Sequence, residues 1–183
     1  MEYLIETIKT TLSKTKVEKL ASIASDQTFS VLDLIDMSFN KDEQIGFRAA
    51  WILERVYSFH QQRFLPYTDS FLERLPAQQN LSALRHFTKI LALMTKKNAS
   101  PEIREVISAY DTEFLAEVVF AWLIDEKIPV AVKSHCLNIL ANLCQKHMWI
   151  KNELVETMEF LVSKESIAFF AKVKQIRKQL KIN

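Results

Sequence analysis

The segment DEQIGFRAAWIL, residues Asp42–Leu53, contains the pattern that decides the fold. Its apolar residues Ile45, Ala49 and Leu53 recur every four positions, which places them on one face of an α-helix. Asp42 precedes this run, where its carboxylate can accept hydrogen bonds from the free backbone amides of the first helical turn. The segment therefore predicts an amphipathic helix near residues 42–60.

Two later segments repeat this pattern. Ile45–Leu53, Ala83–Leu91 and Val132–Leu140 all end in Ile-Leu, and each is followed three positions later by another apolar residue. The copies begin 38 and then 49 residues apart, and the longer interval contains an additional predicted helix near 101–109. A period near 40 residues that is built from two helices is typical of solenoid proteins.

The segment Asp42–Leu53 resembles the second helix of a HEAT repeat, with its acidic start, its small residue and its later leucine. Gly46 stands where a basic residue is common in that family, whereas the third copy has Lys133 there. The second copy departs most, because Phe87 occupies the small position. The resemblance covers residues 29–163 and implies a HEAT/ARM-like α-solenoid, an all-α fold in which antiparallel helical hairpins form an α-α superhelix.

Composition also favours helices. Gly46 is the only glycine in 183 residues, and the Asn-Gly and Asp-Gly dipeptides that favour tight β-hairpins do not occur. Asp42 and Asn80 are predicted N-caps, and Pro66, Pro101 and Pro129 fit the starts of helices. The periodicity predicts helices near residues 2–12, 16–25, 29–38, 42–60, 67–76, 80–97, 101–109, 112–125, 129–147, 151–163 and 165–180.

No long or low-complexity linker divides the chain, so the sequence predicts a single domain over residues 1–183. Within it we expect N-terminal capping helices at 1–26, HEAT-like hairpins at 27–163 and a basic C-terminal helix at 164–183. The first residues lack a signal-type pattern, and no apolar stretch approaches the roughly 20 residues of a membrane span. We therefore expect a cytoplasmic protein that does not associate with a membrane.

The two cysteines are predicted to be reduced core residues. Cys136 and Cys144 lie eight positions apart in one predicted helix, roughly 12 Å at 1.5 Å per residue, which is too far for a disulfide. His135 and His147 lie too far apart along that helix to complete a zinc site with them. The sequence contains no nucleophile motif and no glycine-rich phosphate loop. It therefore predicts no catalytic residue, metal site or cofactor.

Each repeat copy has one apolar face and one polar face when its residues are placed about 100° apart. The predicted core positions are Ile45, Ala49, Ile52, Leu53, Val56, Ala83, Phe87, Ile90, Leu91, Met94, Val132, Cys136, Ile139, Leu140 and Leu143. Leu93 falls on the opposite face with eight polar or aromatic residues, which are Arg48, Trp51, Arg55, His86, Lys89, His135, Asn138 and Asn142.

These eight residues form the candidate binding site. The HEAT resemblance implies that the second helix of each hairpin lines a concave surface, so that Arg48, His86 and His135 would occupy equivalent positions in successive repeats. Trp51 lies between two arginines, and an exposed aromatic in such a setting is typical of binding hot spots. We expect a non-enzymatic scaffold that binds a protein or peptide; the alternative is that this face is only solvated.

Two rival functions remain open. A nucleic-acid binder or a HEAT-like DNA glycosylase would use Trp122, Asp125 and a continuous basic surface, although the net charge is only +2. The C-terminal lysines and arginine of residues 164–183 fit a solvated helix end, where cations interact favourably with the helix dipole, and a weak anionic contact is the alternative. A homo-oligomer is the third alternative, with Trp149 and Ile150 as exposed apolar residues at its interface.

Overall fold

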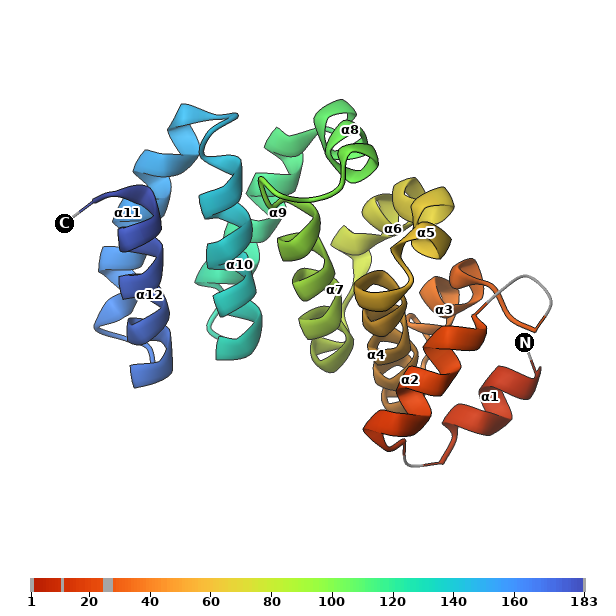
Figure 1. Ribbon diagram of the computed structural model, residues 1–183. Helices are drawn as coiled ribbons and strands as arrows, with labels where there is room; N and C mark the ends of the chain where they lie inside the picture. Colours follow the sequence, from red (N-terminus) through yellow and green to blue (C-terminus); the bar gives the residue numbers. More distant parts are fainter. Residues whose placement is uncertain (1, 11, 25–27, 183) are drawn as a thin grey trace. The chain divides into compact units, whose positions relative to one another are not determined.

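The computed structural model describes residues 2–10, 12–24 and 28–182, which form helices and connecting loops without a β-strand (Figure 1). The all-α repeat fold predicted from the sequence is therefore confirmed. The helices are α1 (Glu2–Ile8), α2 (Lys14–Ile23), α3 (Val31–Met37), α4 (Glu43–Phe59), α5 (Gln61–Phe64), the 3-10 segment η1 (Leu65–Tyr67), α6 (Thr68–Arg74), the 3-10 segment η2 (Leu75–Ala77), α7 (Leu81–Met94), α8 (Pro101–Ala109), α9 (Thr112–Ile124), α10 (Val130–Leu143), α11 (Met148–Val162) and α12 (Ile167–Leu180).

Five predicted helices differ clearly from the observed ones. The helix predicted at 80–97 ends at Met94, and the one predicted at 151–163 begins at Met148. The helix predicted at 2–12 ends at Ile8, and the one predicted at 129–147 ends at Leu143. The region around the predicted helix 67–76 consists of α5, α6 and two 3-10 turns, each of which contains a proline. Proline lacks a backbone N–H, so it favours such short turns over a continuous helix. The boundary predicted between 26 and 27 lies outside the described residues.

Helix caps agree closely with the sequence. Asp42 and Asn80 cap α4 and α7, because their side-chain oxygens accept hydrogen bonds from the first free backbone amides. Pro101 is the first residue of α8. Pro129 is instead the N-cap of α10, one residue before the predicted first turn.

The chain forms two compact units, Met1–Ile90 and Leu91–Asn183, and their boundary falls within α7. In the first unit, α1, α2 and α3 pack against α4; in the second, α9, α11 and α12 pack against α10. Each unit is therefore organised around one long helix, and these two helices contain the first and third copies of the sequence repeat. The single domain over 1–183 stays a prediction.

All fifteen predicted core positions are buried, with at most 8% of each residue exposed. Burial of an aliphatic or aromatic side chain of this size stabilises a fold by about 1.5–3 kcal/mol. The broad apolar face of each repeat helix is therefore the main source of its packing.

Aromatic side chains dominate the core of the first unit. Tyr57, Phe64, Phe71 and Phe87 form a continuous series with ring centroids 4.9–5.3 Å apart, and Phe39 packs edge-on against Phe87 at 5.7 Å. Phe87 replaces the small residue of the repeat because it stacks on the Phe71 ring of α6. The second repeat copy, which departs most from the HEAT pattern, thus packs against α6, in the region where short helices alternate with 3-10 turns.

Gly46 lies where helix α4 is approached closely by residues of neighbouring loops. A Cβ atom at this position would lie 3.0 Å from Asn80 Nδ2 and 3.1 Å from the backbone oxygen of Ser38. Both atoms are held in place: Asn80 Nδ2 donates to the Glu43 carbonyl, and the Ser38 carbonyl accepts from Gln78 Nε2. Neither neighbour can easily move away from an added methyl group.

We expect Gly46→Ala to destabilise the protein by about 1 kcal/mol, although alanine is favoured over glycine by a similar amount in an open helix. The reason is the clash of the new Cβ with Asn80 and Ser38. Urea unfolding followed by circular dichroism measures the change. Gln44→Ala, at an exposed position of the same helix, is the matched control and should change stability by less than about 0.5 kcal/mol. A Gly46→Ala protein that is more stable than wild type would show that Asn80 and Ser38 do not crowd this position.

Candidate functional site

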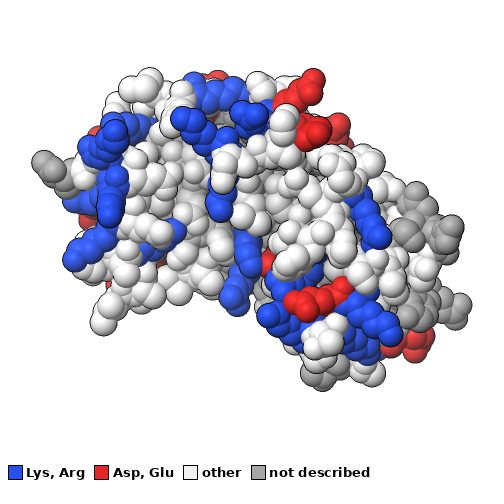
Figure 2. All heavy atoms as spheres, in the orientation of Figure 1, with Lys and Arg blue, Asp and Glu red and all other residues white. Residues whose placement is uncertain are grey.

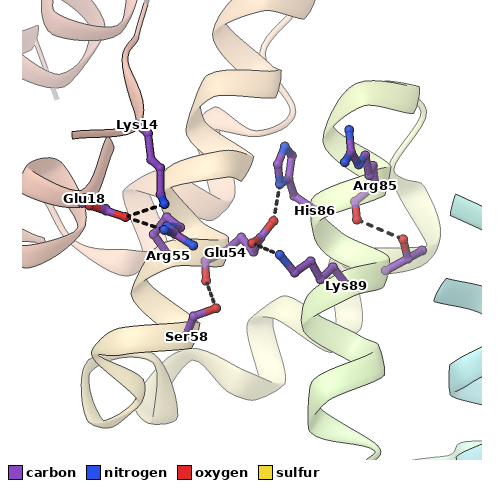
Figure 3. A network of polar contacts seen from close by, with 9 residues as sticks. Lys14, Glu18, Glu54, Arg55, Ser58, Arg85, His86 and Lys89 are labelled. Carbon is purple, nitrogen blue, oxygen red and sulfur yellow. Dashed lines mark hydrogen bonds and ion pairs between the residues drawn. The ribbon is translucent and has the colours of Figure 1, made fainter. Parts of the chain in front are cut away.

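A pocket of about 290 Å³ opens on the first unit, beside helices α2, α4 and α7. It contains four of the eight predicted site residues. Its lining residues are Lys14, Phe47, Trp51, Glu54, Arg55, Arg85, His86 and Lys89. Figure 3 shows how the polar members of this group converge from the three helices.

One side of the pocket is aromatic. The rings of Phe47 and Trp51 are stacked with their centroids 6.0 Å apart, and both approach the imidazole of His86, at 5.4 Å and 6.5 Å. The indole of Trp51 is only partly covered. The pocket therefore presents flat, apolar surface to a ligand.

Glu54 is a buried carboxylate at the base of the pocket, and only 4% of it is exposed. His86 Nδ1 donates to its Oε2 and Lys89 Nζ donates to its Oε1, both at 2.5 Å. Burial opposes ionisation of Glu54, but the hydrogen bonds and charges of His86 and Lys89 outweigh it and lower the pKa from 4.5 to about 2. Glu54 is thus an ionised anchor that joins α4 to α7 (Figure 3).

The orientation of His86 follows from Glu54. Because the ionised carboxylate accepts a hydrogen bond, Nδ1 must carry a proton. His86 is 8% exposed, and its Nε2 is a buried atom without a hydrogen-bond partner among the residues that the structure describes. Nε of Arg55, another residue of the pocket, is also buried without a partner among the described residues, so two such atoms belong to the pocket lining.

Cations surround the pocket. Arg55 pairs with Glu18 at 2.5 Å, and Lys14 approaches the same carboxylate at 4.0 Å. The guanidinium of Arg85 is exposed and has no hydrogen bond or ion pair within the described part of the chain. With Lys89, four cations face only the two carboxylates of Glu18 and Glu54, which leaves the pocket with an excess of positive charge.

The remaining predicted residue of the first unit, Arg48, has a structural contact. Its Nη1 donates to the backbone carbonyls of Ile8 and Lys9, both at 2.8 Å. These carbonyls lie at the end of α1, where the helix leaves them without intrahelical partners. Arg48 therefore connects α1 to α4 through two hydrogen bonds.

The other three predicted residues lie on α10 in the second unit. His135, Asn138 and Asn142 are all partly buried. Asn142 Nδ2 donates to the carbonyl of Ala92 and to Thr95 Oγ1, and its Oδ1 accepts from Gln179 Nε2. Asn142 thus bridges α10 to the end of α7 and to α12. The ladder of equivalent polar residues across successive repeats stays a prediction.

Four pocket residues were not predicted from the sequence: Lys14, Phe47, Glu54 and Arg85. The sequence does contain a signal for Glu54, which stands at the repeat position that holds Ala92 and Ala141 in the other two copies; all three residues are buried. A carboxylate in place of a buried alanine needs ionic partners, and Lys89 of the next repeat helix is such a cation.

Other sequence candidates have structural explanations. Cys136 and Cys144 are free and buried, and burial raises the pKa of both thiols, which keeps them unreactive. The expectation that Ile150 is exposed is wrong: it is fully buried, while Trp149 is partly exposed and donates to Glu113. Asp125 accepts a hydrogen bond from the Lys127 amide in the loop after α9.

Two comparisons with known proteins bear on the site. A family model described as a HEAT repeat domain matches residues 4–180, almost the whole chain. No curated protein matches the chain. Among the described helices, none is both long and apolar enough to cross a membrane.

We expect Glu54→Gln to remove a stabilisation that depends on pH. The folded-state pKa of about 2 lies below the ordinary value of 4.5, so the stabilisation is present above pH 4.5 and is lost as the pH falls towards 2. The 2.5-unit difference corresponds to roughly 3 kcal/mol. Urea unfolding from pH 6 to pH 2.5 should show that wild type and variant converge in stability as the pH falls.

Glu73→Gln is the matched control for this measurement, because Glu73 is exposed on α6. Its difference from wild type should stay small at every pH. A constant difference between wild type and Glu54→Gln across the same range would contradict the ionised anchor.

We expect Arg48→Ala to loosen α1, because both hydrogen bonds to the Ile8 and Lys9 carbonyls are lost. Loss of such bonds costs about 1–3 kcal/mol, and amide exchange in α1 should accelerate. Hydrogen–deuterium exchange followed by mass spectrometry measures the effect. Arg104→Ala, at an exposed position of α8, is the control and should leave α1 unchanged. Unchanged exchange in the Arg48→Ala protein would show that α1 is held by its apolar contacts alone.

Proposed function

Since the chain belongs to the HEAT repeat domain family, we propose that it is a non-enzymatic scaffold that binds an extended segment of a partner protein. The pocket lined by Trp51, His86 and Lys89 is the binding site in this proposal. HEAT repeats are helical scaffolds, and a pocket beside a repeat helix gives such a scaffold a place for one anchoring side chain.

The partly exposed Trp51 is the observation that carries the proposal. Its ring stacks on Phe47 on one side, and the pocket opens beside it. Tryptophan and arginine are the residue types most enriched at binding hot spots, and here Trp51 is accompanied by Arg55 and Arg85. A rigid aromatic surface also loses little conformational entropy when a ligand packs on it.

The chemistry of the pocket favours binding over catalysis. The Glu54–His86 pair resembles the carboxylate–histidine part of a hydrolase triad, in which the imidazole activates a neighbouring nucleophile. None of the residues that line this pocket is a serine, threonine or cysteine. The pair therefore has a more direct role in positioning the imidazole for recognition of a ligand.

The arrangement of charges speaks against a nucleic-acid surface in the first unit. Such a surface requires cations that are free to contact successive phosphates. Arg48 instead contacts backbone carbonyls, Arg55 pairs with Glu18 and Lys89 pairs with Glu54. Figure 2 likewise shows acidic atoms between the basic ones over the region of α2 and α4. The positive charge is gathered at one pocket and does not form a continuous track.

A cytoplasmic location is part of the same proposal. Both cysteines are free, as is usual in a reducing compartment.

We expect selection of random 12-residue peptides displayed on phage to yield ligands that depend on Trp51. Trp51→Ala should weaken the binding of a selected peptide at least tenfold, because the aromatic anchor is lost. Fluorescence anisotropy of the labelled synthetic peptide measures the dissociation constant.

Trp149→Ala is the matched control, because it removes a partly exposed tryptophan of the second unit. It should leave the dissociation constant unchanged. Selected peptides whose affinity is insensitive to Trp51→Ala would overturn this pocket as the binding site, and failure to select any peptide would overturn the proposed function.

A further inference from the structure

We infer that the pocket recognises a side-chain carboxylate, an aspartate or glutamate of the bound segment, through the guanidinium of Arg85 and Nε2 of His86. This inference rests on the proposed function and specifies the chemistry of the partner segment. Its three supports are the unpaired imidazole atom, the free guanidinium and the excess of positive charge.

The unpaired Nε2 of His86 is the first support. A buried polar atom without a hydrogen bond destabilises the fold by about 1–3 kcal/mol, so such atoms are rare outside functional sites. Glu54 fixes the other ring nitrogen, so Nε2 lies on the side of the ring away from that carboxylate. His86 lines the pocket but Nε2 itself is buried, so a ligand in the pocket supplies the missing partner once the side chains that cover Nε2 move apart.

Arg85 is the second support. It precedes His86 on α7 and lines the same pocket, but its guanidinium has no partner among the described residues. The planar guanidinium presents paired N–H donors at the spacing of the two oxygens of a carboxylate. Arg85 and His86 together therefore offer donors to one acidic group, and Figure 3 shows both side chains beside α7.

The excess of positive charge around the pocket favours a negatively charged ligand group. Lys14 and Arg55 share the carboxylate of Glu18, and Lys89 pairs with Glu54, so the four cations exceed these two carboxylates by two charges. Arg85 has no carboxylate partner among the described residues. A positively charged ligand group would be repelled by this set of cations. A carboxylate would offset it without displacing any of the existing ion pairs.

Protonation of His86 follows from this geometry. With Nδ1 donating to Glu54, the neutral imidazole has a lone pair on Nε2 and cannot donate to a carboxylate. A carboxylate is therefore recognised by the imidazolium form, in which Nε2 also donates and the ring lies between two carboxylates. The groups that face His86 are Glu54 and Lys89, its α7 neighbour Arg85, and, across the pocket, Lys14 and Arg55 of α2 and α4.

The stacked rings of Phe47 and Trp51 determine which side chain of the partner segment can lie next to its acidic residue. Phe47 and Trp51 stack beside His86, so a flat or apolar side chain next to the acidic residue fits the remaining surface. The preferred segment thus combines an acidic residue with an apolar or aromatic neighbour. Free acidic amino acids lack this second contact and should bind more weakly.

The test uses the peptides selected on phage, synthesised with an amidated C-terminus so that only side chains supply carboxylates. Each acidic residue is replaced in turn by its amide, Glu by Gln or Asp by Asn. We expect one replacement to weaken binding to the wild-type protein roughly 10- to 100-fold, as for loss of a charge-assisted hydrogen bond. In the Arg85→Gln protein the same replacement should change the affinity less than about threefold, because the carboxylate has already lost its main partner.

Arg104→Gln is the matched control, because Arg104 is an exposed arginine of α8 outside the pocket. It should preserve the full difference between the acidic and the amide peptide. His86→Gln should weaken binding of the acidic peptide, because the Nε2 donor is lost, and should change the affinity for the amide peptide less than about threefold.

If His86→Gln does not fold, the ¹⁵N signals of the His86 side chain in wild type replace that variant. They should show a protonated Nε2 in the complex with the acidic peptide. Peptides that bind through Trp51 with equal affinity as acid and amide would overturn the inference while the scaffold function stands. Binding of the acidic peptide without a protonated Nε2 would overturn the role of His86.

Discussion

The structure depends on the fact that a single helical hairpin cannot bury its own apolar surface. Helices α4 and α10 each have apolar residues over a broad face, and neighbouring helices on several sides are needed to cover it. Three features of the structure follow from this constraint. The loops between helices are short, and Gly46 lacks a side chain because residues of neighbouring loops pack against it. Polar residues at the margins of the broad apolar face become partly buried.

Because polar residues at the margins of the apolar face are partly buried, most charged residues of the candidate site are paired. Glu54 occupies a buried position that is alanine in the other two copies, and a carboxylate there is tolerated only when it is ionised and paired. His86 and Lys89, from the next repeat helix, provide that pairing. The same contacts that stabilise Glu54 also fix the tautomer of His86. Folding therefore determines which ring nitrogen is left without a partner.

The sequence was sufficient for the fold, because apolar periodicity, caps and prolines are local signals. The fifteen core positions and the caps at Asp42 and Asn80 were correct for this reason. The candidate site was predicted only in part. Trp51, Arg55, His86 and Lys89 line one pocket, but Arg48 and Asn142 have structural contacts with residues distant in sequence. No periodicity encodes which backbone carbonyl a long side chain will reach.

This difference follows from the length of the side chains on the polar face. An arginine can cross the width of a neighbouring helix, so its position on a helical wheel does not determine its contact. Arg48 and Arg55 stand seven residues apart on the same face of α4, yet one binds the end of α1 and the other binds Glu18 of α2. Arg85 lacks such a carbonyl or carboxylate partner within the described residues, and His86 beside it leaves one nitrogen unpaired. Arg85 and the unpaired nitrogen of His86, next to side chains that are paired, are therefore the observations that support the proposed binding surface over a merely solvated polar face.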